Sequence, residues 1–258
     1  SVLGSSYTQK GRSGFRGKGS CLLHRKGEKQ MQPLELYIHI PFCVKKCAYC
    51  DFLSGPAGEK EKEEYVKMLV DEIRNCPDPV QNYRVISIFF GGGTPSLLTG
   101  EQIGRLMDTV REIFTLDEDA EITMEMNPGT VTEEKLRKYR QAGVNRLSIG
   151  LQSVNDEELR LLGRIHTYEE FLEAYHLARA NGFSNINVDL ISAIPGQTVE
   201  SWRRTLEQVM ALSPEHISAY SLILEEGTTF YKKYVEDEAK EGPKLPDEDA
   251  EMIKQAQR

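Results

Sequence analysis

Three cysteines stand close together near the start of the chain, as Cys43, Cys47 and Cys50 in a C-x3-C-x2-C pattern. A thiolate is a soft metal ligand, and three of them in one loop can converge on one metal centre. Most iron–sulfur clusters are held by four cysteines, so a set of three leaves one iron with an open coordination position. The spacing therefore predicts a [4Fe-4S] cluster that binds a further ligand.

The main alternative is a zinc-stabilised binding module, with His39 or the distant Cys76 as the fourth ligand. The pattern lacks the paired C-x2-C spacing of a zinc ribbon, which disfavours this reading. A second alternative treats the three thiols as reduced core cysteines. They lie among Lys45, Lys46 and Asp51, in a loop where buried structural thiols are unusual. The cluster is therefore the favoured interpretation.

A glycine run, GGGTP at 91–95, directly follows the β-like run RVISIFF at 84–90. Three glycines allow positive φ and let the backbone approach a ligand closely. A phosphate-binding loop would need a following Gly-Lys-Ser/Thr, which this sequence lacks. We therefore expect either a plain turn or a loop that contacts a bound molecule.

Further polar residues occur at or just beyond the C-terminal ends of later predicted strands. They are Glu125, Asn127, Ser148, Gln152 and Asp189. Parallel strands are buried on both faces, so a polar side chain within one costs a few kcal/mol unless a partner satisfies it. A bound polar cofactor is the expected partner.

The remaining candidate ligands carry less information. His166, His176 and His216 show no ligand spacing among them, so we expect core or solvent-facing roles. Met124 and Met126 flank Glu125 and are predicted to pack in the core.

The elements that position these residues alternate regularly along the chain. Strands are predicted at 34–40, 84–90, 121–126, 145–150, 185–191 and 216–222, and helices near 59–75, at 101–114, at 132–141, within 155–180 and at 199–211. Six β/α units predict an α/β fold with a parallel sheet. The pattern alone allows an open doubly wound sheet or a partial barrel, and both gather their chemistry at the C-terminal ends of the strands.

Charge and cysteine usage exclude several classes of function. The net charge of the 258 residues is -8, and residues 1–30 hold seven Lys or Arg against one acid, which leaves -14 on residues 31–258. An acidic body disfavours nucleic acid as a partner. Five cysteines, an odd number, without a secretory leader favour the reducing cytoplasm. No apolar run approaches the ~18 residues of a membrane span, so no integral membrane segment is expected.

The two ends of the chain differ from its body. Residues 1–30 are rich in Gly, Ser and basic residues and predict a disordered basic extension. A mitochondrial transit peptide is less favoured, because the six glycines of this segment disfavour an amphipathic helix. Residues 229–242 predict a polar helix, and 246–258 predict another that the chain end interrupts. We expect a core domain at 31–235 and the start of a truncated C-terminal domain at 236–258.

The segment YIHIPFCVKKCAYCDF at 37–52 resembles the cluster loop of the radical S-adenosylmethionine (SAM) family related to oxygen-independent coproporphyrinogen III oxidase. The resemblance implies a partial (β/α)6 TIM-like barrel followed by a truncated C-terminal domain. It also implies a [4Fe-4S] cluster whose open iron chelates the amino and carboxylate groups of SAM. One electron from an external donor, passed through the cluster, then breaks a C–S bond to give a 5′-deoxyadenosyl radical.

The same resemblance implies a set of SAM contacts. Nine residues fall on family positions that touch SAM: Tyr37, Gly92, Gly93, Thr94, Glu125, Gln152, Arg164, Asp189 and Ile223. Arg164 is expected to pair with the SAM carboxylate. Glu125 and Asp189 are expected at the ribose hydroxyls or the ammonium, and Tyr37 beside the cluster.

Two departures from the family pattern bear on function. The oxidase branch has a further cysteine two positions after the last cluster cysteine, whereas this chain has Asp51-Phe52, which resembles the heme-chaperone branch. That branch implies binding of heme or porphyrin and delivery of heme to acceptor proteins, with the oxidase as the enzymatic alternative. Its heme segment lies in the C-terminal domain, beyond this chain. The second departure is Ser192-Ala193-Ile194, where the family usually has Tyr-Gly-Leu.

Overall fold

The structure is a computed structural model that describes residues 31–76 and 82–236. The predicted basic extension at 1–30 lies outside these ranges. So does all but the first residue of the segment predicted to open a C-terminal domain at 236–258.

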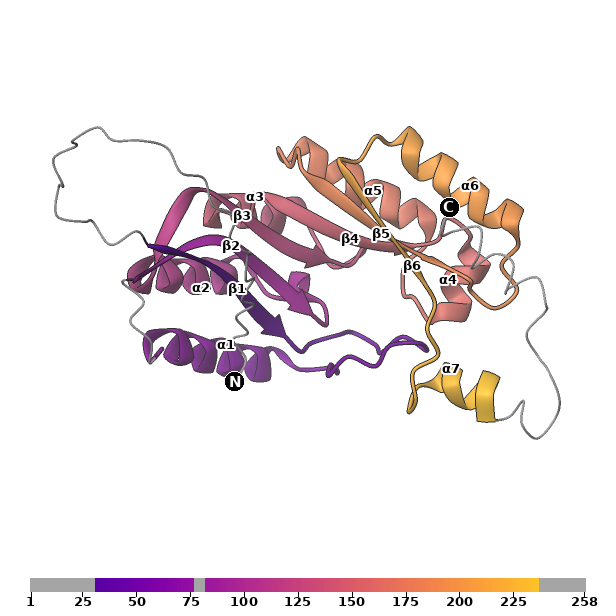
Figure 1. Cartoon of the computed structure of the whole chain (residues 1–258), viewed down its shortest axis with the longest axis horizontal. Coiled ribbons are helices and arrows are strands. Elements are labelled where there is room, and N and C mark those ends of the chain that lie inside the picture. Colours follow the sequence, from indigo (N-terminus) through magenta and orange to yellow (C-terminus); the bar gives the residue numbers. More distant parts are fainter. Residues whose placement is uncertain (1–30, 77–81, 237–258) are drawn as a thin grey trace, which may run out of the picture.

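Six parallel strands form one sheet in the order in which they occur along the chain (Figure 1). They are β1 (Gln32–Ile40), β2 (Tyr83–Gly92), β3 (Thr115–Met126), β4 (Arg146–Gln152), β5 (Ile186–Ser192) and β6 (His216–Ser221). A doubly wound sheet would reverse its strand order at a switch point. The sequential order therefore confirms the partial barrel, with β1 and β6 as its edges.

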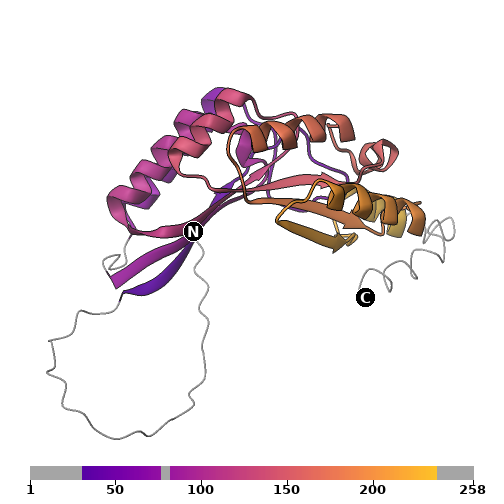
Figure 2. The ribbon, with the colours of Figure 1, turned by 90° about the horizontal axis from the view of Figure 1, so that it is seen from above.

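The helices connect successive strands. They are α1 (Glu59–Arg74), the 3-10 turn η2 (Pro95–Leu97), α2 (Gly100–Ile113), α3 (Glu133–Ala142), α4 (Asp156–Leu162), α5 (Tyr168–Ala180) and α6 (Val199–Ala211). Right-handed crossovers between sequential parallel strands place every connection on the same face of the sheet. Figure 2 shows the helices along one side of the curved sheet. The opposite, concave face is left for function.

The main core lies between the helices and the convex face of the sheet. Alternate residues of β1 and one stripe of α1 belong to it: Leu36, Ile38, Ile40, Val66, Leu69 and Ile73. Because side chains alternate along a strand, the intervening Tyr37 and His39 point to the concave face. Met124 and Met126 are likewise buried in this core, as predicted, so Glu125 between them faces the concave side.

Local capping sets the ends of α2 and α3, which lie within one residue of the predicted bounds. The hydroxyl of Thr99 accepts from the Gln102 backbone N–H and the Gln102 side chain accepts from the Thr99 N–H, which makes a capping box at the start of α2. At α3 the hydroxyl of Thr132 accepts from the Lys135 backbone N–H. Gly143 follows α3 with φ of 106°, in the left-handed conformation typical of helix C-caps.

The segment after β6 differs from the predicted polar helix. It forms one turn, α7 (Thr229–Tyr231), and a π-helical turn over Lys232–Glu236. Phe230 and Tyr234 lie four residues apart and are both buried, in a second small core that includes Leu162 and Ile191. The predicted helix is confirmed over the described residues 229–236, but it is not polar on every face, because these two aromatic side chains share one face and pack against the domain. The remainder of that segment lies outside the described residues.

Candidate functional site

The loop after β1 carries the three cysteines to one pocket. Its base is closed by two backbone hydrogen bonds, from Gly55 N–H to the Pro41 carbonyl at 3.0 Å and from Cys43 N–H to the Gly55 carbonyl at 2.9 Å. Cys43, Cys47 and Cys50 are half-buried. All three line a pocket of about 600 Å³ at the C-terminal ends of the strands.

A second set of contacts holds the far side of this loop. Ala48 N–H donates to the Leu162 carbonyl at 2.9 Å, and Phe230 N–H donates to the Ala48 carbonyl at 3.0 Å. Next to Ala48, Tyr49 lines the pocket, and burial raises the pKa of its phenol. The end of α4 and the α7 turn therefore fix the position of the cysteine loop.

The thiols receive polar contacts from two other loops. Thr94 Oγ1 donates to Cys43 Sγ at 3.6 Å, and Arg164 Nη1 donates to Cys47 Sγ at 3.7 Å. Burial raises the pKa of the Cys50 thiol, against a hydrogen bond from the Phe52 backbone, and the other two thiols raise it further.

The donor set fits a multi-iron cluster better than a single zinc ion. Among the described residues, no three His, Cys, Asp or Glu side chains are arranged to hold one metal ion. A cluster needs less convergence, because each thiolate binds a different iron atom. The proposed fourth zinc ligands, His39 and Cys76, are not among the residues that line the pocket.

The glycine run packs against the end of β1. Gly92 has φ of 113°, and a side chain there would collide with the His39 ring. A Cβ on Gly93 would lie 2.6 Å from the carbonyl oxygen of Phe42, while Gly93 N–H donates to the Ile40 carbonyl at 2.8 Å. Of the three glycines, Gly92 alone uses the positive φ that the run allows. The close approach that requires glycine at Gly92 and Gly93 is to the chain itself.

Two carboxylates face the pocket from β3 and β5. Burial raises the pKa of Glu125 to about 7, although the Gly92 N–H donates to it at 3.0 Å, and the charge of Asp189 adds to the rise. Asp189 accepts from Ser148 Oγ at 2.8 Å and from Asn187 Nδ2 at 2.7 Å. A carboxyl group that titrates near neutrality inside a cleft is typical of a binding or catalytic site.

Arg164 lies between the cysteines and the ends of β3 and β4. Its Nη2 donates to Asn127 Oδ1 at 2.6 Å and to the Gly150 carbonyl at 2.7 Å, while its buried Nε has no partner among the described residues. Gln152 ends β4 with φ of 77°, a conformation that is costly for a side-chain-bearing residue and is found mainly at functional sites.

Eight of the nine predicted SAM contacts share this pocket with the three cysteines: Gly92, Gly93, Thr94, Glu125, Gln152, Arg164, Asp189 and Ile223. Tyr37 is the exception. It is absent from the lining and stacks on Phe89 with ring centroids 6.0 Å apart. Sequence reasoning missed several further lining residues, among them Tyr49, Gly150, Tyr220 and Leu222, which carry no distinctive pattern of their own.

The family model for the Radical SAM superfamily matches residues 37–209, from β1 into α6. The chain belongs to the radical SAM superfamily. Membership implies a [4Fe-4S] cluster and SAM. The site fits both, because it combines three thiols in one loop, a cleft of about 600 Å³ and a buried guanidinium nitrogen without a partner among the described residues.

Several radical SAM relatives are similar over most of this chain. It is 45% identical over 222 residues to the heme chaperone HemW of Escherichia coli (strain K12), a match that covers 86% of this chain and 57% of that protein. It is 39% identical over 196 residues to radical S-adenosyl methionine domain-containing protein 1, mitochondrial, of Mus musculus, covering 76% of this chain and 44% of that protein. The chain therefore spans about half the length of these relatives.

Solved radical SAM structures agree with the fold. Coproporphyrinogen III oxidase (HemN) from Escherichia coli superposes with a TM-score of 0.71 at 30% identity, covering 88% of this chain and 52% of that one. The methyltransferase TsrM from Kitasatospora setae superposes with a TM-score of 0.57 at 16% identity, covering 81% of this chain and 37% of that one, which supports the fold alone. No helix of the described residues is long and apolar enough to cross a membrane.

Proposed function

We propose that this chain is the radical SAM part of a heme chaperone, which binds heme and delivers it to acceptor proteins. The observation that carries the proposal is the 45% identity to the heme chaperone HemW of E. coli over 86% of the chain. Asp51-Phe52 after the last cysteine supports the same branch.

Within this proposal, Cys43, Cys47 and Cys50 ligate the [4Fe-4S] cluster. When bound and reduced by an external donor, the cluster supplies the electron that cleaves a C–S bond of SAM. SAM would occupy this pocket and contact the eight of the nine residues assigned by resemblance that line it. Glu125 would hold the ammonium or ribose hydroxyls, since a cation beside it would favour its charged form.

The cluster assignment is tested by iron and sulfide analysis after anaerobic reconstitution, with visible spectra before and after addition of SAM. The expected result is about four irons per chain and a spectrum that SAM perturbs. Cys43→Ala, Cys47→Ala and Cys50→Ala should each lose the cluster. Cys76→Ala is the matched control, because Cys76 follows α1 outside the pocket. A full cluster in Cys43→Ala, or stoichiometric zinc without iron, would contradict the assignment.

The chaperone assignment is tested by joining this chain to the C-terminal heme segment that the resemblance implies, titrating the product with ferric heme and then adding a heme-free acceptor protein. Binding should shift the heme absorption, and the acceptor should gain the heme faster from the loaded chain than from free heme. No spectral change on mixing would reject the proposal.

A second candidate is oxygen-independent coproporphyrinogen III oxidase, favoured by the superposition with the E. coli enzyme at a TM-score of 0.71. That activity decarboxylates two propionates of its substrate by hydrogen abstraction. Anaerobic incubation with coproporphyrinogen, SAM and a reductant separates the two candidates. Formation of the decarboxylated product would establish the oxidase instead.

We propose the cytoplasm as the compartment, in line with the bacterial relatives. The mouse relative is named a mitochondrial protein, which makes the mitochondrion the competing assignment. Imaging of a fluorescent fusion with and without residues 1–30 separates the two: import that depends on residues 1–30 would overturn the cytoplasmic assignment.

A further inference from the structure

Strand β4 has an irregularity where it reaches the pocket. Its register to β5 passes directly from Gly150 to Gln152, so Leu151 between them has no register partner and forms a β-bulge. Gln152 therefore lies opposite Leu190, whereas an unbroken ladder would place it opposite Ile191, about 3.3 Å further along the strand. The bulge draws Gln152 back toward the middle of the sheet.

The side chain of Gln152 lies across Gly150. A Cβ on Gly150 would be 3.0 Å from Nε2 of Gln152 and 3.2 Å from Nη2 of Arg164, so both polar groups lie against this glycine. All three residues line the pocket. The backbone of Gln152, with φ of 77°, has a conformation that persists only where the surrounding structure imposes it. The position of the Gln152 amide therefore depends on what holds the bulge.

Two side chains from the turn between α4 and α5 hold the bulge. Nη2 of Arg164 donates to the Gly150 carbonyl at 2.7 Å, and Nε2 of His166 donates to the Leu151 carbonyl at 3.2 Å. A carbonyl can only accept, so Nε2 carries the proton of the His166 ring. Burial lowers the pKa of His166 to about 3, and the charge of Arg164 adds to this effect. The ring is therefore neutral and keeps its Nε2 donor at ordinary pH.

His166 has the predicted core position, with 4% of its surface exposed, but packing alone does not account for it. Its Nδ1 is buried and has no hydrogen-bond partner among the described residues. An unpaired buried polar atom costs free energy that an apolar side chain of similar size would avoid. Within the same part of the chain, the bond to Leu151 is the hydrogen bond that the ring does make. What histidine adds at this position is therefore its hold on the bulge.

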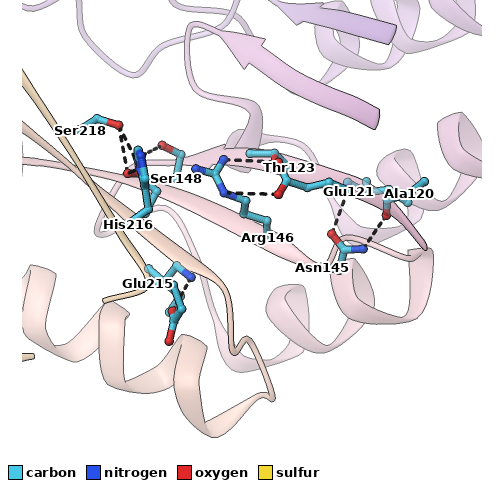
Figure 3. Close-up of polar contacts among 12 residues, drawn as sticks. Ala120, Glu121, Thr123, Asn145, Arg146, Ser148, Glu215, His216 and Ser218 are labelled. Atoms are coloured by element: carbon cyan, nitrogen blue, oxygen red, sulfur yellow. Dashed lines mark hydrogen bonds and ion pairs between the residues drawn. The ribbon is translucent and has the colours of Figure 1, made fainter. Parts of the chain in front are cut away.

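The carboxylate of Asp189, on the next strand, is oriented in a different way. It accepts from Ser148 Oγ at 2.8 Å and from Asn187 Nδ2 at 2.7 Å. Asn187 Oδ1 in turn contacts His216 and Ser218, which end this network in Figure 3. These partners lie on β4, β5 and β6, where the register is unbroken. Asp189 is thus held by the sheet itself, whereas Gln152 depends on the bulge and on the turn after α4.

We propose that His166 is a positioning residue for SAM, because its Nε2–H holds the bulge that places the Gln152 amide in the pocket. This inference rests on the proposed function, in which SAM occupies that pocket. His166 is not among the residues that line the pocket, so it acts through the backbone of Leu151 and Gln152. The amide of Gln152 offers both a donor and an acceptor to a polar cofactor, and its use requires that it be held in place.

The test measures the affinity of the anaerobically reconstituted full chain for SAM, from the change that SAM causes in the visible spectrum. Three variants change residue 166. His166→Gln places an amide N–H near the position of Nε2, while His166→Asn carries the same amide but stops short of the Leu151 carbonyl. His166→Leu removes the donor and leaves no unpaired polar side-chain atom. Iron content and thermal unfolding are measured for each variant.

His166→Asn and His166→Leu should each weaken SAM binding by about 10-fold at unchanged iron content, whereas His166→Gln should stay within about 3-fold of wild type. Either of the first two decides the test if the other does not fold. The matched control is Tyr175→Phe, which loses a hydrogen bond from a buried hydroxyl to the Leu212 carbonyl away from the pocket. It should lower Tm and keep the wild-type affinity for SAM.

A double-mutant cycle tests whether His166 acts through Gln152. Adding His166→Asn to Gln152→Ala should weaken SAM binding by less than about 3-fold further. Wild-type affinity in His166→Leu, equal losses in His166→Asn and His166→Gln, or fully additive losses in the cycle would each overturn the positioning role and leave the SAM site standing. A wild-type spectrum that SAM does not change would instead reject the proposed SAM site.

Discussion

Ala193 lies just after β5 with φ of 58°. This is the left-handed region, where the Cβ of an L-residue comes too close to the following carbonyl oxygen, at a cost of about 1–2 kcal/mol. The family that the sequence resembles usually has glycine at this position. We therefore expect Ala193→Gly to stabilise the fold, although Ala-to-Gly substitutions ordinarily destabilise.

The expected size follows from two opposing terms. Glycine removes a strain of about 1–2 kcal/mol, while its greater freedom in the unfolded chain costs roughly 0.5–1 kcal/mol. The Ala193 methyl group is only half-buried, so its loss should lower the free energy of unfolding by only about a few tenths of a kcal/mol more. The net gain should be about 0.5 kcal/mol, and up to ~1 kcal/mol if the strain is at the upper end. For a chain of this size that raises Tm by roughly 1–4 °C.

Thermal and urea unfolding provide the assay. Ser213→Gly is a matched second case, because Ser213 is exposed and has φ of 52°, and it should also stabilise. Ala174→Gly in the middle of α5 is the opposite control and should cost about 1 kcal/mol. If Ala193→Gly lowers Tm as Ala174→Gly does, then the backbone at 193 is not strained and the reasoning fails.

Three further substitutions test the site and its supports. Glu125→Gln removes a carboxyl group whose pKa is raised from 4.5 to about 7 in the folded protein. Because the folded state keeps this proton to higher pH than the unfolded state does, the free energy of unfolding of the wild type should decrease as pH rises between these two values. The variant should not show this decrease when unfolding is measured at about pH 5 and at about pH 8. Gly93→Ala places a Cβ 2.6 Å from the carbonyl oxygen of Phe42, so it should lower the free energy of unfolding by about 1–3 kcal/mol and reduce the iron content. The control is Gly104→Ala, whose Cβ would have nothing within 4 Å and which should raise the free energy of unfolding by roughly 0.5–1 kcal/mol. Phe230→Ala should cost about 3 kcal/mol and speed cluster loss in air, followed by visible absorbance.

The sequence predicts the βα alternation well because strands and helices differ in hydrophobic period. Strands β5 and β6 were predicted to within one residue at each end. β3 is longer than predicted and begins at Thr115 rather than 121. Its polar first half pairs through the backbone, with Thr115 opposite Arg84, and main-chain pairing leaves no hydrophobic pattern. Side-chain patterning therefore locates strands where they bury apolar surface and misses them where they do not.

The site was predicted by residue type and position, but its internal contacts were not. Arg164 and Cys47 lie 117 positions apart and meet only in the fold. The contacts of Arg164 with Asn127 and Gly150 likewise join the ends of two different strands to the loop after α4. His216 was expected in a core or solvent-facing role, and its oriented ring depends on Asn187, an interior residue of β5 that carries no motif. Register across strands is set by global packing, so sequence spacing could not place these pairs together.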